Sequence, residues 1–154
     1  MEQDKNVVAA MLGTSMMTLS SYIVSNVQDN NFKEPEILGK LIGRLYPFLK
    51  KEHGQIMGWT LHYLVGLLFA EIYAPLWEKT PMQPNLKNGL ILGGISGIAA
   101  ILVWKFTLEM HPDPVRVNFK KYAGHLFFAH VVFGLFAVVG YNFMRKNKLG
   151  FIDR

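Results

Sequence analysis

The sequence predicts an all-α integral membrane protein: an antiparallel four-helix bundle with one amphipathic helix at the membrane interface. The main observation is that four long segments contain no Asp, Glu, Lys or Arg, and these segments are 6–28, 54–70, 88–104 and 122–144. A membrane-spanning helix needs about 20 mostly apolar residues, with a lower limit of about 17. Because lipid offers no hydrogen-bond partner to backbone N–H and C=O groups, such segments are expected to be helices.

The composition supports a single transmembrane domain over residues 1–154. Hydrophobic residues make up 51% of the chain, charged residues 18%, and the net charge is +5. The Lys and Arg residues lie outside the charge-free segments, so the lipid bilayer is the expected partner, with other membrane proteins or a second copy of this chain as further candidates. No basic face with interleaved aromatic residues lies outside the apolar segments, so a nucleic acid is not expected as a partner. The chain has no cysteine, which excludes disulfides, zinc–thiolate sites and iron–sulfur clusters.

The first span is predicted over about 7–27 and carries a stripe of hydroxyl groups. Thr14, Thr18, Ser21 and Ser25 follow one another at steps of four, three and four residues, so they share one face of a helix. Hydroxyl groups in membrane helices usually face other helices and form hydrogen bonds to them. The stripe therefore predicts a packing seam, and a polar pathway is the alternative.

The connection after the first span predicts an amphipathic helix over about 36–49. Its apolar residues repeat at helical spacing and its charged residues fall largely opposite them. The segment is too short and too charged to cross a membrane, so we expect it to lie in the membrane plane with its apolar side in the acyl boundary. Pro35 suits the first turn of this helix, and Pro47 should bend or end it.

The three remaining spans are predicted over about 55–77, 88–110 and 119–144. The third must end at the sequence His-Pro-Asp-Pro, residues 111–114, because prolines cannot continue the helical hydrogen bonds.

The third span also contains a ladder of glycines at every fourth position, Gly89, Gly93 and Gly97. A glycine-rich run can mark a phosphate-binding loop, but this one lacks the following Lys-Ser/Thr and follows no strand. The ladder therefore predicts close packing against another helix.

A motif in the second span recurs in the fourth with the same internal spacing. The residues His62, Gly66, Leu67 and Tyr73 are matched in order by His130, Gly134, Leu135 and Tyr141. We interpret the match as a tandem repeat of two helical hairpins, related by an axis along the membrane normal.

The repeated histidines are the first candidate polar or ligand site. His62 and His130 are expected to face the bundle interior, on helices that approach a neighbour closely at Gly66 and Gly134. The structural interpretation is that each ring is bonded to a hydroxyl or carbonyl group of the protein. One alternative is a pair of ligands for haem b or a divalent metal, which often lie on facing helices of a bundle. A proton-titrating site is the other alternative.

Glu71 is the second candidate for this site. It lies on the face of the second span opposite His62, so the two are not partners within one helix. A charged residue at the centre of a span costs about 2.5–3.5 kcal/mol or more, so Glu71 should face protein or water. Both a structural pairing and a functional polar site fit this residue.

The stretch AAMLGTSMMT, residues 9–18, resembles the opening of small, uncharacterised four-span bacterial inner-membrane proteins of the YagU-like type. Those proteins also tend to carry a His-x-x-x-Gly span near the end, as His130 and Gly134 do here. The resemblance implies a four-helix fold in the bacterial cytoplasmic membrane, and it implies no particular reaction.

The functional expectation follows from what the spans contain. They show scattered single polar groups, with no nucleophile–base pair and no acidic cluster at one depth, so the pattern leans away from an enzyme. We expect an accessory or assembly component or a small transport-like unit. The alternative is a membrane electron carrier that binds haem or a metal through His62 and His130.

Overall fold

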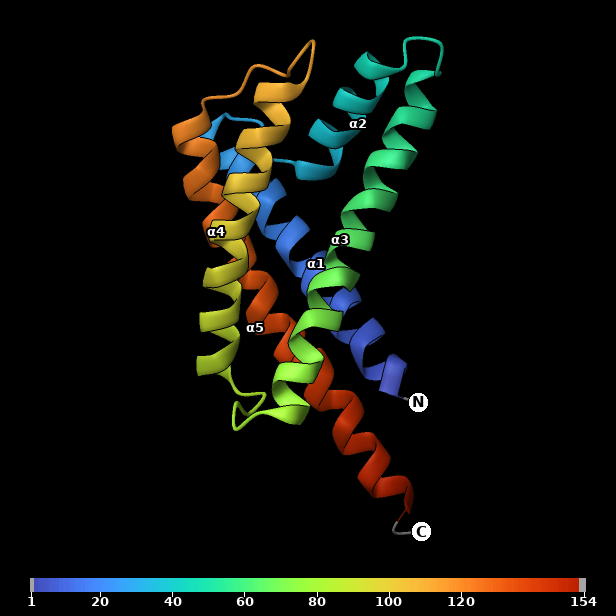
Figure 1. Ribbon diagram of the computed structural model, residues 1–154, viewed down its shortest axis with the longest axis vertical. Coiled ribbons are helices and arrows are strands. Elements are labelled where there is room, and N and C mark those ends of the chain that lie inside the picture. The colour runs from blue at the N-terminus through green and yellow to red at the C-terminus, as the bar shows by residue number, and fades with distance from the viewer. Residues whose placement is uncertain (1, 153–154) are drawn as a thin grey trace.

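The structure, a computed structural model, describes residues 2–152, and it describes side-chain surroundings for residues 3–146. Over this part of the chain it contains helices and no strand (Figure 1). The helices in chain order are α1 (Glu2–Gln28), α2 (Glu34–Leu45), α3 (Lys51–Lys79), α4 (Leu86–Met110) and α5 (Phe119–Ile152). The all-α prediction is confirmed.

Four of these helices are long and apolar enough to cross a membrane, and each contains one of the predicted spans. They are Gln3–Gln28, Lys51–Lys79, Leu86–Met110 and Phe119–Lys146. Many large apolar side chains lie exposed on their outer faces, which suits contact with lipid. Figure 1 shows these four helices alternating in direction, so that the start of α1 and the C-terminal part of α5 lie at the same end of the bundle. The chain is therefore an integral membrane protein with a helical bundle.

The helix ends follow from local chemistry. The Asn85 side chain accepts a hydrogen bond from the backbone N–H of Asn88 at 2.9 Å, which caps the start of α4. Proline lies in the first turn of α2, where its missing N–H costs nothing, and Pro47 follows two residues after the end of that helix. Likewise α4 ends at Met110, before the paired prolines.

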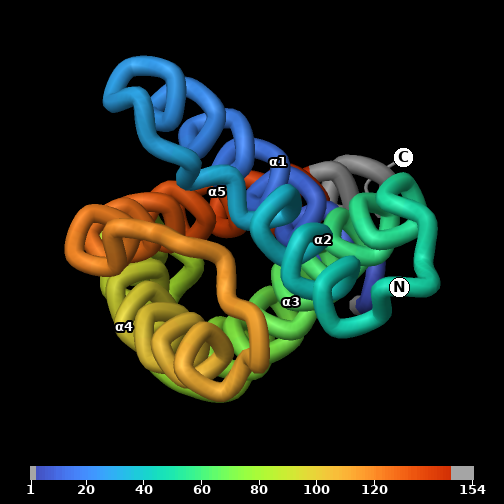
Figure 2. Tube along the Cα trace, turned by 90° about the horizontal axis from the view of Figure 1, so that it is seen from above, coloured from blue at the N-terminus to red at the C-terminus, as the bar shows by residue number. Residues whose placement is uncertain are grey.

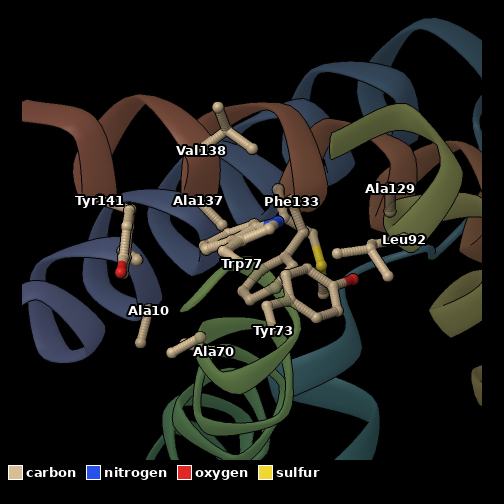
Figure 3. Close-up of a cluster of buried hydrophobic side chains, with 13 residues drawn as sticks. Ala10, Ala70, Tyr73, Trp77, Leu92, Ala129, Phe133, Ala137, Val138 and Tyr141 are labelled. Carbon is tan, nitrogen blue, oxygen red and sulfur yellow. The ribbon is translucent and has the colours of Figure 1, made fainter. Parts of the chain in front are cut away.

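Helix α5 lies at the centre of the packing, against both α1 and α4. A β-carbon placed on Gly89 would lie 2.8 Å from the carbonyl oxygen of Gly134, and one on Gly93 would lie 2.6 Å from that of His130. The glycine ladder of α4 thus faces the backbone of α5. Figure 3 shows the apolar core beside this contact, with Trp77 of α3 directed toward α5.

The structure differs from the prediction for α2 in its bounds and in its surroundings. The helix spans Glu34–Leu45 where 36–49 was predicted, because the chain leaves the helical conformation before Pro47. Its apolar residues Ile37 and Leu41 are buried in a core cluster with residues of α4 and α5, and not in the acyl boundary. Figure 1 shows α2 rising beside the first turns of α3, and not lying at right angles to the bundle.

Glycines explain this packing of α2. Gly58 of α3 lies against the backbone of Pro35 and Gly39 of α2, so the two helices approach at backbone distance. The level of α2 relative to the membrane surface stays a prediction.

The repeated motif places its two glycines in comparable positions. Gly66 of α3 lies against the Thr14 side chain of α1, and Gly134 of α5 lies against Gly89 and Gly93 of α4. Each glycine thus contacts the first helix of its own predicted hairpin. The repeat itself stays a prediction.

Candidate functional site

A cavity of about 280 Å³ lies inside the bundle, and residues of all five helices line it. Its walls include Leu68 of α3 and Val103 of α4, whose side chains are 58% and 64% exposed, so the cavity opens sideways between these helices. In the view from above (Figure 2), α2 lies beside α3, and α4 lies across from these two helices. A hydrogen bond of 2.7 Å between the hydroxyl groups of Tyr73 and Ser96 joins α3 to α4.

A buried carboxyl group from α2 lines this cavity. Glu34 is 2% exposed, and its Oε1 atom accepts a hydrogen bond from the Ser21 hydroxyl at 3.2 Å. The His125 Nε2 atom of α5 lies 3.3 Å from the same oxygen. The other oxygen, Oε2, is buried and has no hydrogen-bond partner among the described residues. Removing a carboxylate from water costs several kcal/mol unless partners surround it, so a half-satisfied one is an exception that needs an explanation.

His125 completes the polar contact between α1, α2 and α5. Its Nε2 atom lies 2.9 Å from the Ser21 hydroxyl, and its ring stacks on Phe32 with the ring centroids 4.7 Å apart. Phe32 is itself buried in the loop before α2, and its backbone N–H donates to the Ser25 hydroxyl at 3.0 Å. These contacts fix the loop before α2, and with it Glu34 at the start of that helix, against α1 and α5.

The two predicted histidines both line the cavity, and each is 5% exposed. His62 Nε2 lies 2.9 Å from the Thr18 hydroxyl, which donates its own hydrogen to the Thr14 carbonyl at 2.7 Å. A hydroxyl group has one hydrogen, so with that bond to Thr14 formed, His62 Nε2 is the donor to Thr18. His130 Nδ1 lies 2.8 Å from the Leu126 carbonyl oxygen, so this nitrogen is the donor.

The hydroxyl stripe of α1 faces this interior along its whole length. All four of its residues are buried, and three of them contact residues of the site: Thr18, Ser21 and Ser25. The fourth, Thr14, lines the cavity, and its hydroxyl oxygen has no partner among the described residues.

Glu71 lies away from the cavity. It is exposed on the other face of α3, where its Oε2 atom accepts a hydrogen bond of 3.0 Å from the Asn6 side chain of α1. The structure thus brings His62 and His130 to one cavity and leaves Glu71 outside it.

Sequence reasoning missed Glu34 and His125. Glu34 lies in a connection rich in charged residues, and His125 lies near a span end, so both had the pattern of surface residues. The one signal that could have indicated them is the hydroxyl stripe, because such a stripe needs polar partners on neighbouring helices.

Taken together, the residues form a polar cluster beside an apolar cavity. The Glu34 Oε2, His125 Nδ1 and Thr14 hydroxyl atoms of this cluster are buried without a hydrogen-bond partner among the described residues. Comparison of the chain with protein-family models, with curated proteins and with solved structures found no match.

Proposed function

We propose that this protein is a small transport-like unit of the bacterial cytoplasmic membrane, which takes a small ligand into its interior cavity. The observation that carries the proposal is Glu34, which lines the cavity and whose buried carboxyl group has one oxygen without a hydrogen-bond partner among the described residues. Ionisable residues inside membrane bundles are costly, and they typically mark pathways for substrates, ions or protons. A purely structural pair would be expected to use both oxygens of the carboxyl group.

The sideways opening supports uptake from the bilayer. Leu68 and Val103 are exposed on the lipid-facing surface and also border the cavity, so an apolar ligand dissolved in the membrane meets no polar barrier at this entrance. The bacterial location rests on the resemblance of residues 9–18 to YagU-like proteins.

The electron-carrier alternative is less well supported by the geometry. An iron or divalent metal held between His62 and His130 would need a free ring nitrogen on both. The hydrogen bonds to Thr18 and Leu126 use one nitrogen of each ring and leave the other nitrogen of each. No third His, Cys, Asp or Glu lies close enough to complete a metal site with them among the described residues. Visible absorption of the purified protein tests this alternative, because a haem carrier would show a Soret band that is lost in His62→Ala and in His130→Ala.

Chemical access to Glu34 tests the main proposal. Dicyclohexylcarbodiimide dissolves in hydrocarbon and modifies carboxyl groups that it reaches from the bilayer. In membranes we expect mass spectrometry to find its adduct on Glu34 and none at that position in Glu34→Gln. A phenylalanine at position 99 should slow the modification, because Ala99 lines the cavity.

The matched control for that variant is Ile95→Phe. Ile95 lies one turn away on α4 and is 59% exposed, but it does not line the cavity. Equal rates of modification in Ala99→Phe and Ile95→Phe, or no modification of Glu34 at all, would contradict the proposal.

A further inference from the structure

The charge on the cavity wall has one sign. Glu34 lines the cavity, and no Lys or Arg side chain does so within the described part of the chain. The Glu34 Oε2 atom is buried behind the cavity wall without a hydrogen-bond partner among the described residues. An ionised carboxyl group has acceptor oxygens and no donor, so its negative charge favours a cation over an anion in the adjoining cavity.

His125 contacts Glu34 outside the cavity. Its Nε2 atom lies 3.3 Å from the Glu34 Oε1 atom, and His125 is not among the described residues that line the cavity. A ligand in the cavity therefore meets Glu34 and not His125.

Three aromatic residues in the cavity wall also favour a cation. Phe69, Trp104 and Phe133 line the cavity, and aromatic faces attract ammonium groups through their quadrupole. Groups of aromatic side chains are a usual means of binding quaternary ammonium ligands.

The volume of the cavity limits the size of the ligand. An apolar cavity of about 150 Å³ accommodates benzene. At about 280 Å³ this cavity has room for one aromatic or aliphatic ring and a compact charged head.

We propose that the ligand is a small monovalent organic cation, with a tertiary or quaternary ammonium head and one compact apolar group. The head lies beside Glu34 and the aromatic residues of the cavity wall, and the apolar group lies toward the opening between α3 and α4. This inference rests on the proposed function, because it assumes that the cavity takes up a ligand.

A second groove provides an internal comparison. It lies between α1 and α3, has a volume of about 420 Å³, and includes Trp59 and Met11 in its wall. Apolar and neutral polar residues line it, without a charged side chain, so it offers an organic cation no opposite charge.

Binding of benzyltrimethylammonium tests the inference. Because Trp104 lines the cavity, its fluorescence should change saturably when this cation is added to the protein in nanodiscs of neutral lipid. Empty nanodiscs give the blank, and Trp104→Phe identifies the tryptophan that responds. Glu34→Gln should weaken binding by about tenfold or more, because it removes the charge and keeps the side-chain shape. Glu71→Gln is the matched control, because Glu71 lies outside the cavity and should leave the affinity unchanged.

Two further ligands separate the contribution of the charge to binding from that of the molecular shape. Neopentylbenzene has the shape of the cation without its charge, and phenylmethanesulfonate carries the opposite charge. The inference requires the cation to bind most tightly in the wild type and to lose that advantage over neopentylbenzene in Glu34→Gln. If Glu34→Gln fails to fold, Glu34→Asp, which keeps the charge, and the three ligands on the wild type decide the question.

The outcomes also distinguish this inference from the proposed function. Equal or tighter binding of neopentylbenzene or the sulfonate would overturn the cation assignment and leave a ligand cavity in place. No response of Trp104 to any of the three would overturn the cation assignment as well. The modification of Glu34 by the carbodiimide then decides separately whether the cavity is accessible.

Discussion

The contact between α4 and α5 gives a quantitative prediction, through the substitution Gly93→Ala. The added β-carbon would lie 2.6 Å from the carbonyl oxygen of His130 and 2.8 Å from the Cα atom of Val131. Carbon atoms in favourable contact lie about 3.5–4.0 Å apart, so the two backbones must separate by about 1 Å. Overpacking of this kind costs about 1–3 kcal/mol.

Gly124→Ala in α5 is the matched control, because a β-carbon there would meet nothing within 4 Å. Both variants gain about 1 kcal/mol from the higher helix propensity of alanine, so this gain cancels between them. We therefore expect Gly93→Ala to unfold more easily than Gly124→Ala, by about 1–3 kcal/mol in the free energy of unfolding.

The assay is reversible unfolding in mixed micelles by increasing fractions of dodecyl sulfate, followed by far-UV circular dichroism. Gly124→Ala should require more dodecyl sulfate than the wild type. The same midpoint for Gly93→Ala and Gly124→Ala would refute the close approach of α4 and α5 at Gly93.

Three further predictions concern the interior, the packing of α2 and the topology. A double-mutant cycle with Thr18→Val and His62→Ala should give a coupling free energy of about 0.5–1.5 kcal/mol, and zero coupling would contradict their hydrogen bond. Gly58→Leu should displace α2 from α3 and speed amide hydrogen exchange in α2, whereas unchanged exchange would show that the two backbones are not in contact. Single cysteines at Gln3 and Arg145 should be labelled from the same side of the membrane, because the start of α1 and the C-terminal part of α5 lie at one end of the bundle in Figure 1, and labelling from opposite sides would rule out four spans.

The spans were predictable because their signal is local. A long run without charged residues forms a helix in a bilayer, because only a helix satisfies its backbone hydrogen bonds there, and the proline at 35 indicated the start of α2. The predicted end at 49 was wrong, because the helix ends at Leu45, before Pro47. The position of α2 was not predictable in this way. Its amphipathic pattern shows that one face of the helix is buried, but it does not show which helix buries it. The packing of α2 on α3 depends on the close approach of Gly39 and Gly58, which lie on separate helices.

The candidate site was predictable only in part, for a related reason. The histidines of the two apolar spans were found because a polar residue in an apolar run is conspicuous, and both line the cavity. Glu34 was not found from the sequence, because a glutamate among other charged residues has the pattern of a surface residue. Its burial depends on Ser21 and His125, which lie on other helices, and no periodicity in the sequence relates the three.

The central claim is that the interior cavity beside Glu34 is where a ligand binds. Nuclear Overhauser effects between the N-methyl protons of benzyltrimethylammonium and the indole rings, recorded in nanodiscs, test it most directly. We predict cross-peaks to Trp104, on the cavity wall, that disappear in Glu34→Gln. Cross-peaks to Trp59 alone, in the groove between α1 and α3, would contradict the claim.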